Sequence, residues 1–210
     1  MSSSPKATGA TAAEEGRVRW RRFAATMLSA GALGAGLVAL TANGVLAAQF
    51  AISGIPFTVT ADRLEGTGFA QFATLDHMIE GSPNEGDTGG QIVVIVSAID
   101  EATLTNLCQS IDMGGMHMKI TAGNKGTPVR ARTLVVDSDL ITGNASFKNI
   151  DIGQDASTLD KVPGVRGLPG IFGQQADKVE ITNLRQKNYA TTAAAFTLPH
   201  LRMQFSSDGC

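Results

Sequence analysis

The sequence is poor in the residues that mark several common classes of protein. Only 17% of its 210 residues are charged and 5% are aromatic, and the net charge is −2. A nucleic-acid-binding domain needs a strongly basic face, so no nucleic-acid partner is expected. A disordered chain has few apolar residues, whereas 43% of this chain is hydrophobic. The composition therefore predicts a folded domain.

No motif in the chain specifies a reaction. The G-x-S-x-G elbow of α/β-hydrolases is absent, and His77, His117 and His200 do not have the spacing of zinc ligands. His117 stands in an alternating segment and is expected to face solvent. The paired carboxylates match no calcium-binding loop. We therefore predict no catalytic residues, no metal site and no cofactor, and the sequence favours a non-enzymatic protein while leaving an enzyme open.

The chain has only two cysteines, Cys108 and Cys210. Their separation fits neither a thioredoxin-type motif nor a metal-binding motif. If the domain lies outside the cytoplasm, one disulfide between them is the expected state. The alternative is a pair of free thiols.

Charge is distributed unevenly along the chain. Residues 1–22 have a net charge of +3, residues 23–48 are uncharged, and the remainder has a net charge of −5. An apolar run of this length exceeds the roughly 20 residues that cross a bilayer core. Four arginines precede it within residues 17–22. The positive-inside rule then places residues 1–22, predicted to be a disordered tail, in the cytoplasm and residues 49–210 outside.

The sequence leaves the fate of the apolar segment open. It would hold the protein in the cell membrane as a transmembrane helix if it is retained. Val45 and Ala47 are small enough for cleavage after Ala47, which would release the domain. Arg21-Arg22 is also similar to part of a twin-arginine signal, so both the general and the twin-arginine export routes stay open.

From Gln49 onward, apolar residues recur at every second position, which is the period of a half-buried strand. Glycine-containing turns are predicted between the strands, and the two helix candidates, 102–110 and 189–195, are short. The fold class is therefore mainly β: a single β-rich domain, either a sandwich or an elongated layered structure. The predicted strands are 55–62, 91–96, 116–121, 129–136, 179–181 and 196–203, and the predicted turns are 66–68, 84–87, 123–124 and 142–144.

Three segments share an apolar-x-apolar-x-Asn-apolar pattern in which the asparagine is Asn106, Asn149 or Asn183. Asparagine tolerates the left-handed backbone conformation better than most residues do. The pattern therefore predicts equivalent bends or ends of strands. The alternative is a chance recurrence among many short strands.

Residues 160–175 have a glycine at every third position from Gly164 and are predicted to form a long loop. An ordinary structural loop is one interpretation. In the other, its apolar side chains are exposed together and contact a ligand, the bilayer or a protein partner. These side chains are Val162, Val165, Leu168, Ile171 and Phe172.

Several blocks of sequence carry a resemblance to a known family. They are FTVTADRLEG at 57–66, LCQS at 107–110, IDIG at 150–153, FGQQAD at 172–177 and LRQ at 184–186. Over roughly residues 17–207 the chain resembles a family of uncharacterised membrane or exported proteins from Streptomyces and related actinomycetes, a domain of unknown function. Some members carry the automatic label cholesterol esterase, and the gene often lies beside one for a small multi-spanning membrane protein.

These observations together predict an exported protein of the cell envelope. The preferred hypothesis is a non-enzymatic β-rich domain that binds a lipid or an envelope partner, such as the small multi-spanning membrane protein that the resemblance implies. The resemblance also implies the alternative of a secreted lipid-ester hydrolase. A third hypothesis is a structural subunit that forms homo-oligomers through the edges of its sheet.

Overall fold

The computed structural model describes residues 51–210, so the predicted tail (1–22) and apolar segment (23–48) lie outside the described residues. The described part is mainly β, with eight strands in one antiparallel sheet and no α-helix. No helix within residues 51–210 is long and apolar enough to cross a membrane. The elements are β1 (Phe57–His77), the 3-10 helix η1 (Gly86–Thr88), β2 (Gln91–Thr105), β3 (Leu107–Asp112), β4 (His117–Ala122), β5 (Val129–Asp155), the 3-10 helix η2 (Ala156–Thr158), β6 (Phe172–Thr192), β7 (Ala195–Thr197) and β8 (Arg202–Ser206).

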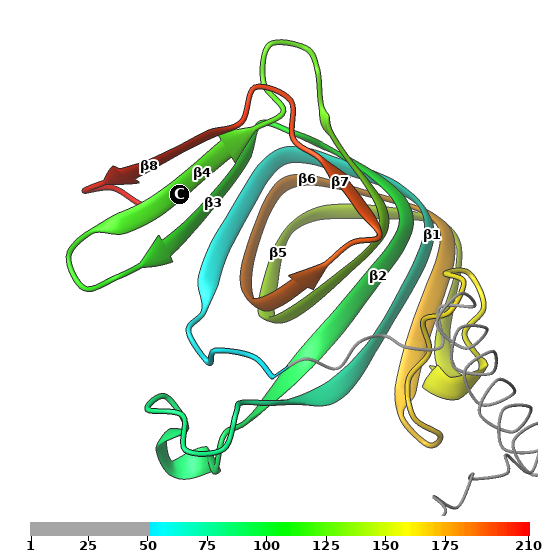
Figure 1. The fold of residues 1–210 in the computed structure, drawn as a ribbon. Helices are drawn as coiled ribbons and strands as arrows, with labels where there is room; N and C mark the ends of the chain where they lie inside the picture. The colour runs from blue at the N-terminus through cyan, green and yellow to red at the C-terminus, as the bar shows by residue number, and fades with distance from the viewer. Residues whose placement is uncertain (1–50) are drawn as a thin grey trace, which may run out of the picture. The chain divides into compact units, whose positions relative to one another are not determined.

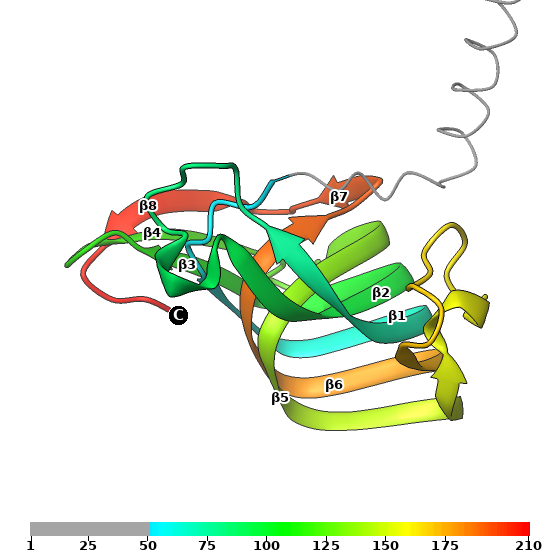
Figure 2. The same cartoon turned by 90° about the horizontal axis from the view of Figure 1, so that it is seen from below.

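Four long strands close the sheet into a ring. β1 pairs with both β2 and β6, and β5 also pairs with both β2 and β6. Figures 1 and 2 show these strands curving together around a common centre. A single sheet therefore encloses an interior among residues 51–210, and the two packed sheets of a sandwich, one of the predicted arrangements, are not what this region forms.

The three asparagines of the recurring pattern all have the left-handed conformation. The φ angles of Asn106, Asn149 and Asn183 are +53°, +52° and +52°, which confirms the prediction of equivalent bends. The side chain of Asn149 donates a hydrogen bond of 2.6 Å to Asp177 on the neighbouring strand, and that of Asn106 donates to Asp62. These contacts fix the bends at Asn106 and Asn149 to the adjacent strand.

Two predicted turns are bends inside long strands instead. Residues 66–68 lie within β1 and residues 142–144 lie within β5. Gly68 has a φ of +66°, and a Cβ atom there would lie 2.5 Å from the carbonyl oxygen of Lys161. Gly143 has a φ of +151° and coincides with a register shift between β5 and β6. Glycine therefore changes the direction of these strands without ending them.

Three further predictions about the elements are corrected. The helix candidate 102–110 is strand except at Asn106, and the candidate 189–195 is strand except at residues 193 and 194. Their threonines suit a pleated surface once neighbouring strands are available. The predicted strand 196–203 is divided between β7 and β8. Pro199 lies in the break and cannot donate to a ladder, and His200 has a φ of +55°.

β3, β4 and β8 extend the sheet from the first residues of β1. Cys108 in β3 is bonded to Cys210 with an S–S distance of 2.01 Å, which confirms the predicted disulfide. The amide of Cys210 donates to Ser110 Oγ at 2.9 Å, and Arg185 of β6 donates to the carbonyl oxygen of Cys210 at 3.0 Å. Cys210 is therefore fixed to both the extension and the ring.

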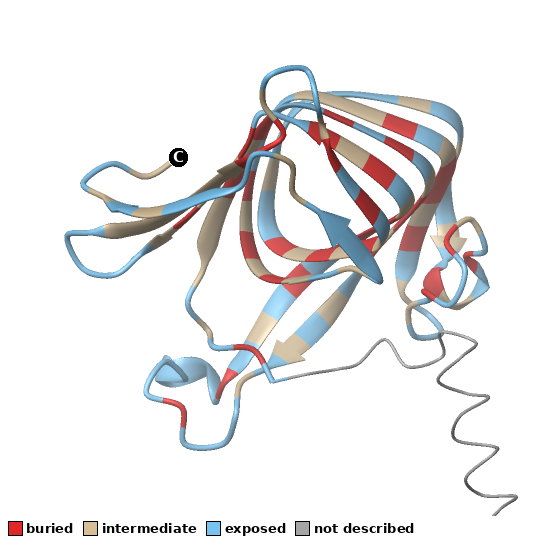
Figure 3. Ribbon diagram, turned by 45° about the horizontal axis from the view of Figure 1, so that its top comes forward, coloured by how far each residue is buried: buried red, intermediate tan, exposed pale blue. Residues whose placement is uncertain are grey.

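Two apolar clusters lie on opposite faces of β1 and β2. Figure 3 shows buried and exposed residues alternating along the ring strands. The larger cluster is inside the ring and includes Phe69 and Ile99. The smaller cluster is outside and joins Phe72 to the loop between η2 and β6. Alternation along the strands produces this division, because successive side chains point to opposite faces.

Candidate functional site

A cavity of about 310 Å³ lies inside the ring. All four ring strands contribute inward-facing side chains to it, and β3 and β7 contribute a few more. Its walls are mostly apolar and include the buried side chains of Leu64, Phe69, Ile99, Leu134 and Val136. A concave, apolar, largely preformed hollow of this size is at the lower end of the range found for small-molecule sites.

A few neutral polar groups interrupt the apolar walls. Gln71 of β1 donates a hydrogen bond of 2.8 Å to Ser97 Oγ of β2, and Gln71 in turn accepts one from Gln174 of β6. Gln186 and Asn188 of β6 also line the cavity and are 6% and 1% exposed. The Oδ1 atom of Asn188 is buried and has no hydrogen-bond partner. A buried acceptor without a donor costs roughly 1–3 kcal/mol.

The position of these amides follows from the period of β6. Gln186 and Asn188 alternate with Arg185 and Lys187, whose side chains contact Cys210 and Asp139 on the other face. The two amides therefore point into the ring while their charged neighbours point away. Alternation of amide and cation in the segment RQKN (185–188) could have identified these inward polar residues from the sequence, but only with knowledge of which face is enclosed.

A second hollow, of about 490 Å³, lies outside the ring between the β1–β2 hairpin and the loop that follows η2. It contains Asp76 and Asp137 among apolar walls that include Phe72 and Val165. Burial raises the pKa of Asp137 to about 7, and the charge of Asp76 adds to this shift. Burial also raises the pKa of Asp76, although His77 opposes it, and Asp76 Oδ2 has no hydrogen-bond partner.

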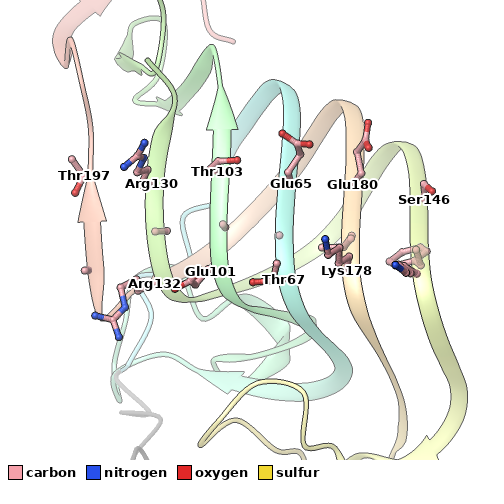
Figure 4. A pocket seen from close by; sticks show the side chains of 17 residues that line it. Glu65, Thr67, Glu101, Thr103, Arg130, Arg132, Ser146, Lys178, Glu180 and Thr197 are labelled. Atoms are coloured by element: carbon pink, nitrogen blue, oxygen red, sulfur yellow. The ribbon is translucent and has the colours of Figure 1, made fainter. Parts of the chain in front are cut away.

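A third hollow, of about 840 Å³, lies on the outer face of the ring and is drawn in Figure 4. Charged side chains of both signs stand on neighbouring strands there, for example Glu65 on β1 beside Glu180 on β6. Arg63 bridges these two carboxylates at 2.9 Å and 3.1 Å. All three are well exposed, so the surface has the mixed charge of an ordinary solvated face. We therefore take the interior cavity as the candidate site.

A family model described as a family of unknown function, DUF6230, matches residues 53–210. The chain belongs to this family. No curated protein and no solved structure matches the chain. The matched residues of DUF6230 include every strand described above and therefore the complete ring and its cavity.

The DUF6230 domain does not expose the five apolar loop residues together. Val162 and Val165 are 1% and 6% exposed and belong to the cluster outside the ring. Leu168 and Phe172 are 70% and 60% exposed, and Ile171 is partly buried against the same cluster. The loop is thus divided between a packed part and two exposed side chains, those of Leu168 and Phe172.

The histidines of the DUF6230 domain are likewise not brought together. His77 lines the second hollow, which also contains Asp76, and His200 is exposed. His117 is partly buried rather than solvent-facing: its Nδ1 atom is buried without a partner, and Gly209 packs against its ring. Among residues 51–210, no group of three His, Cys, Asp or Glu side chains could hold a metal ion.

Proposed function

We propose that this protein is an exported component of the cell envelope that binds a small apolar ligand, of lipid type, in the cavity inside the ring. The cavity itself is the observation that supports this function. A packed core leaves few voids larger than a water molecule, whereas about 310 Å³ corresponds to roughly ten water molecules. A hollow of that size in the centre of a closed sheet fits a ligand better than a packing defect.

Two further observations support a location outside the cytoplasm. The disulfide between Cys108 and Cys210 is typical of proteins in oxidising compartments. The uncharged segment 23–48, with arginines before it, has the length and flanking charge of a membrane segment whose C-terminal side is exported. On this proposal, the domain is held at the membrane or released beside it, where lipid-type ligands are available.

The edge of the sheet favours self-association as a second candidate function. β8 is the last strand of the extension, and it carries Met203 and Phe205, which are 60% and 65% exposed. An exposed edge strand with apolar side chains is a template for pairing with another chain. Sedimentation of the full chain in detergent tests this: a dimer that Phe205→Lys converts to a monomer would support it, and a monomeric wild-type chain would refute it.

Ligand binding is tested by site-resolved photolabelling of the full chain in detergent. A ten-carbon alkane that carries a diazirine should label inward-facing peptides of β5 and β6, and excess unlabelled decane should prevent this. In Ala145→Trp, the indole should fill the mouth of the cavity and reduce the labelling at least tenfold, because Ala145 lines the cavity and is exposed at the surface.

The matched control is Ser146→Trp, the same change one residue further along β5. Ser146 points to the outer charged surface, so labelling of the interior should be unchanged in this variant. Urea denaturation of both variants would show that each is folded. Interior labelling that is absent in the wild type, or that both tryptophans reduce equally, would refute the proposed function.

A further inference from the structure

We infer that the ligand of the interior cavity is a neutral molecule with a hydroxyl group on a single apolar chain, rather than the anion of a fatty acid. This inference rests on the proposed function and specifies the class of ligand. It is carried by two features of the cavity: the absence of charge in its walls and the unpartnered acceptor of Asn188.

The walls contain no group that could neutralise a carboxylate. None of the residues that line the cavity is Lys, Arg or His. The nearby cations of β6 are on its other face, where Lys187 contacts Asp139 at 2.7 Å. Transfer of an unpaired carboxylate from water into such an environment is strongly unfavourable. The cavity therefore selects against an ionised head group.

A neutral head group can form a hydrogen bond with Asn188 in the wall of the cavity. Asn188 is 1% exposed, and its Oδ1 atom accepts no hydrogen bond. An amide oxygen needs a donor, and a hydroxyl group of the ligand can supply one. Gln186, Gln109 and Thr191 also line the cavity as neutral groups that donate and accept. A hydroxyl, which both donates and accepts, therefore suits these walls better than a group that only accepts.

The size of the cavity limits the apolar part. About 310 Å³ holds roughly ten non-hydrogen atoms at the volume of a water molecule each. A longer chain would have to continue past the partly exposed Ile95 and Phe196, which line the cavity and are 38% and 41% exposed. A single chain of about ten carbons with a terminal hydroxyl thus fills the interior, whereas a two-chain lipid does not fit within it.

The experiment compares three diazirine probes on the full chain in detergent at pH 8: decane, 1-decanol and decanoate. The half-saturating concentration for labelling of interior peptides is measured for each. We expect 1-decanol to label at a concentration at least tenfold lower than decanoate. Asn188→Leu, which keeps the volume and removes the acceptor, should raise the half-saturating concentration of 1-decanol about tenfold, the factor for one lost hydrogen bond. It should not raise that of decane.

The control variant is Asn144→Leu, an exposed asparagine in β5 that does not line the cavity, and it should leave all three concentrations unchanged. If decanoate labels as well as 1-decanol, or if Asn188→Leu affects decane and 1-decanol equally, the inference is wrong while ligand binding stands. If none of the probes labels the interior, the proposed function itself fails.

Discussion

We expect Asp137 to make the stability of this domain sensitive to pH. Its carboxyl group is partly buried in the outer cleft with Asp76, and its pKa is raised from 3.8 to about 7. The unfolded chain binds fewer protons than the folded chain between these values. The free energy of unfolding should therefore fall as pH rises from about 4 to about 7, and it should change little through this group above pH 7.

The size of the effect follows from the shift. Each pKa unit corresponds to about 1.4 kcal/mol, so a shift of this size has an upper limit of about 4 kcal/mol. Because Asp137 keeps some contact with solvent, we expect about 2 kcal/mol. Asp137→Asn removes the ionisation. It should be about 2 kcal/mol more stable than the wild type at pH 8 and about equal to it at pH 4.

Urea denaturation followed by circular dichroism at pH 4, 6 and 8 measures this difference. Asp76→Asn should reduce the pH dependence as well, because the charge of Asp76 contributes to the raised pKa of Asp137. Asp151→Asn, an exposed change on the same strand, is the control for altered net charge. Parallel stability curves for the wild type and Asp137→Asn would refute the reasoning.

Two further predictions concern the disulfide and the bends. Cys210→Ser should lower the free energy of unfolding by about 4–5 kcal/mol relative to the oxidised wild type, because the bond closes a loop of about 100 residues; an equal stability of the two in urea would contradict this. Asn183→Ala and Asn149→Ala should each cost about 1–2 kcal/mol, because alanine lacks the short polar side chain that lets asparagine tolerate the left-handed conformation, whereas Asn183→Gly should cost less. Urea denaturation distinguishes these outcomes, and a loss as large for Asn183→Gly as for Asn183→Ala would contradict the role of backbone conformation.

Local patterns in the sequence predicted the local features of this fold. Alternation identified most of the strands, since it reports which face of a strand is buried. The asparagine pattern identified three bends because a left-handed residue is a property of the residue itself. The pairing of Cys108 with Cys210 followed from there being only two cysteines.

Closure of the ring could not be predicted in the same way. It depends on register between distant segments, for example Val135 of β5 with both Ala98 of β2 and Thr192 of β6. Alternation specifies a face but not a partner. The cavity, its buried amides and the cleft of Asp76 and Asp137 all arise from this closure, so no local pattern could place them.

The burial of side chains in the loop between η2 and β6 could not be predicted from local sequence either. Its apolar residues and glycines suggested one exposed patch. The outer faces of β1 and β2, however, carry Ala70 and Ala98, both fully buried, and these small side chains leave room for Val162 and Val165. The volume of residues on other strands therefore decides which loop side chains are buried.

The energetic cost of an unfilled interior favours a ligand over an empty ring. The hollow is lined mainly by apolar side chains and reaches the surface beside Ala145, Ile95 and Phe196. Apolar walls left in contact with water are less favourable than walls covered by a ligand by about 25 cal/mol per Å². The buried Oδ1 atom of Asn188, which has no donor, costs roughly 1–3 kcal/mol more. A ligand that fills the cavity and donates to Asn188 Oδ1 removes both penalties together. Asn188 therefore links occupancy of the cavity to the polarity of the ligand, because a ligand that donates a hydrogen bond to Oδ1 is favoured over one that only fills the space.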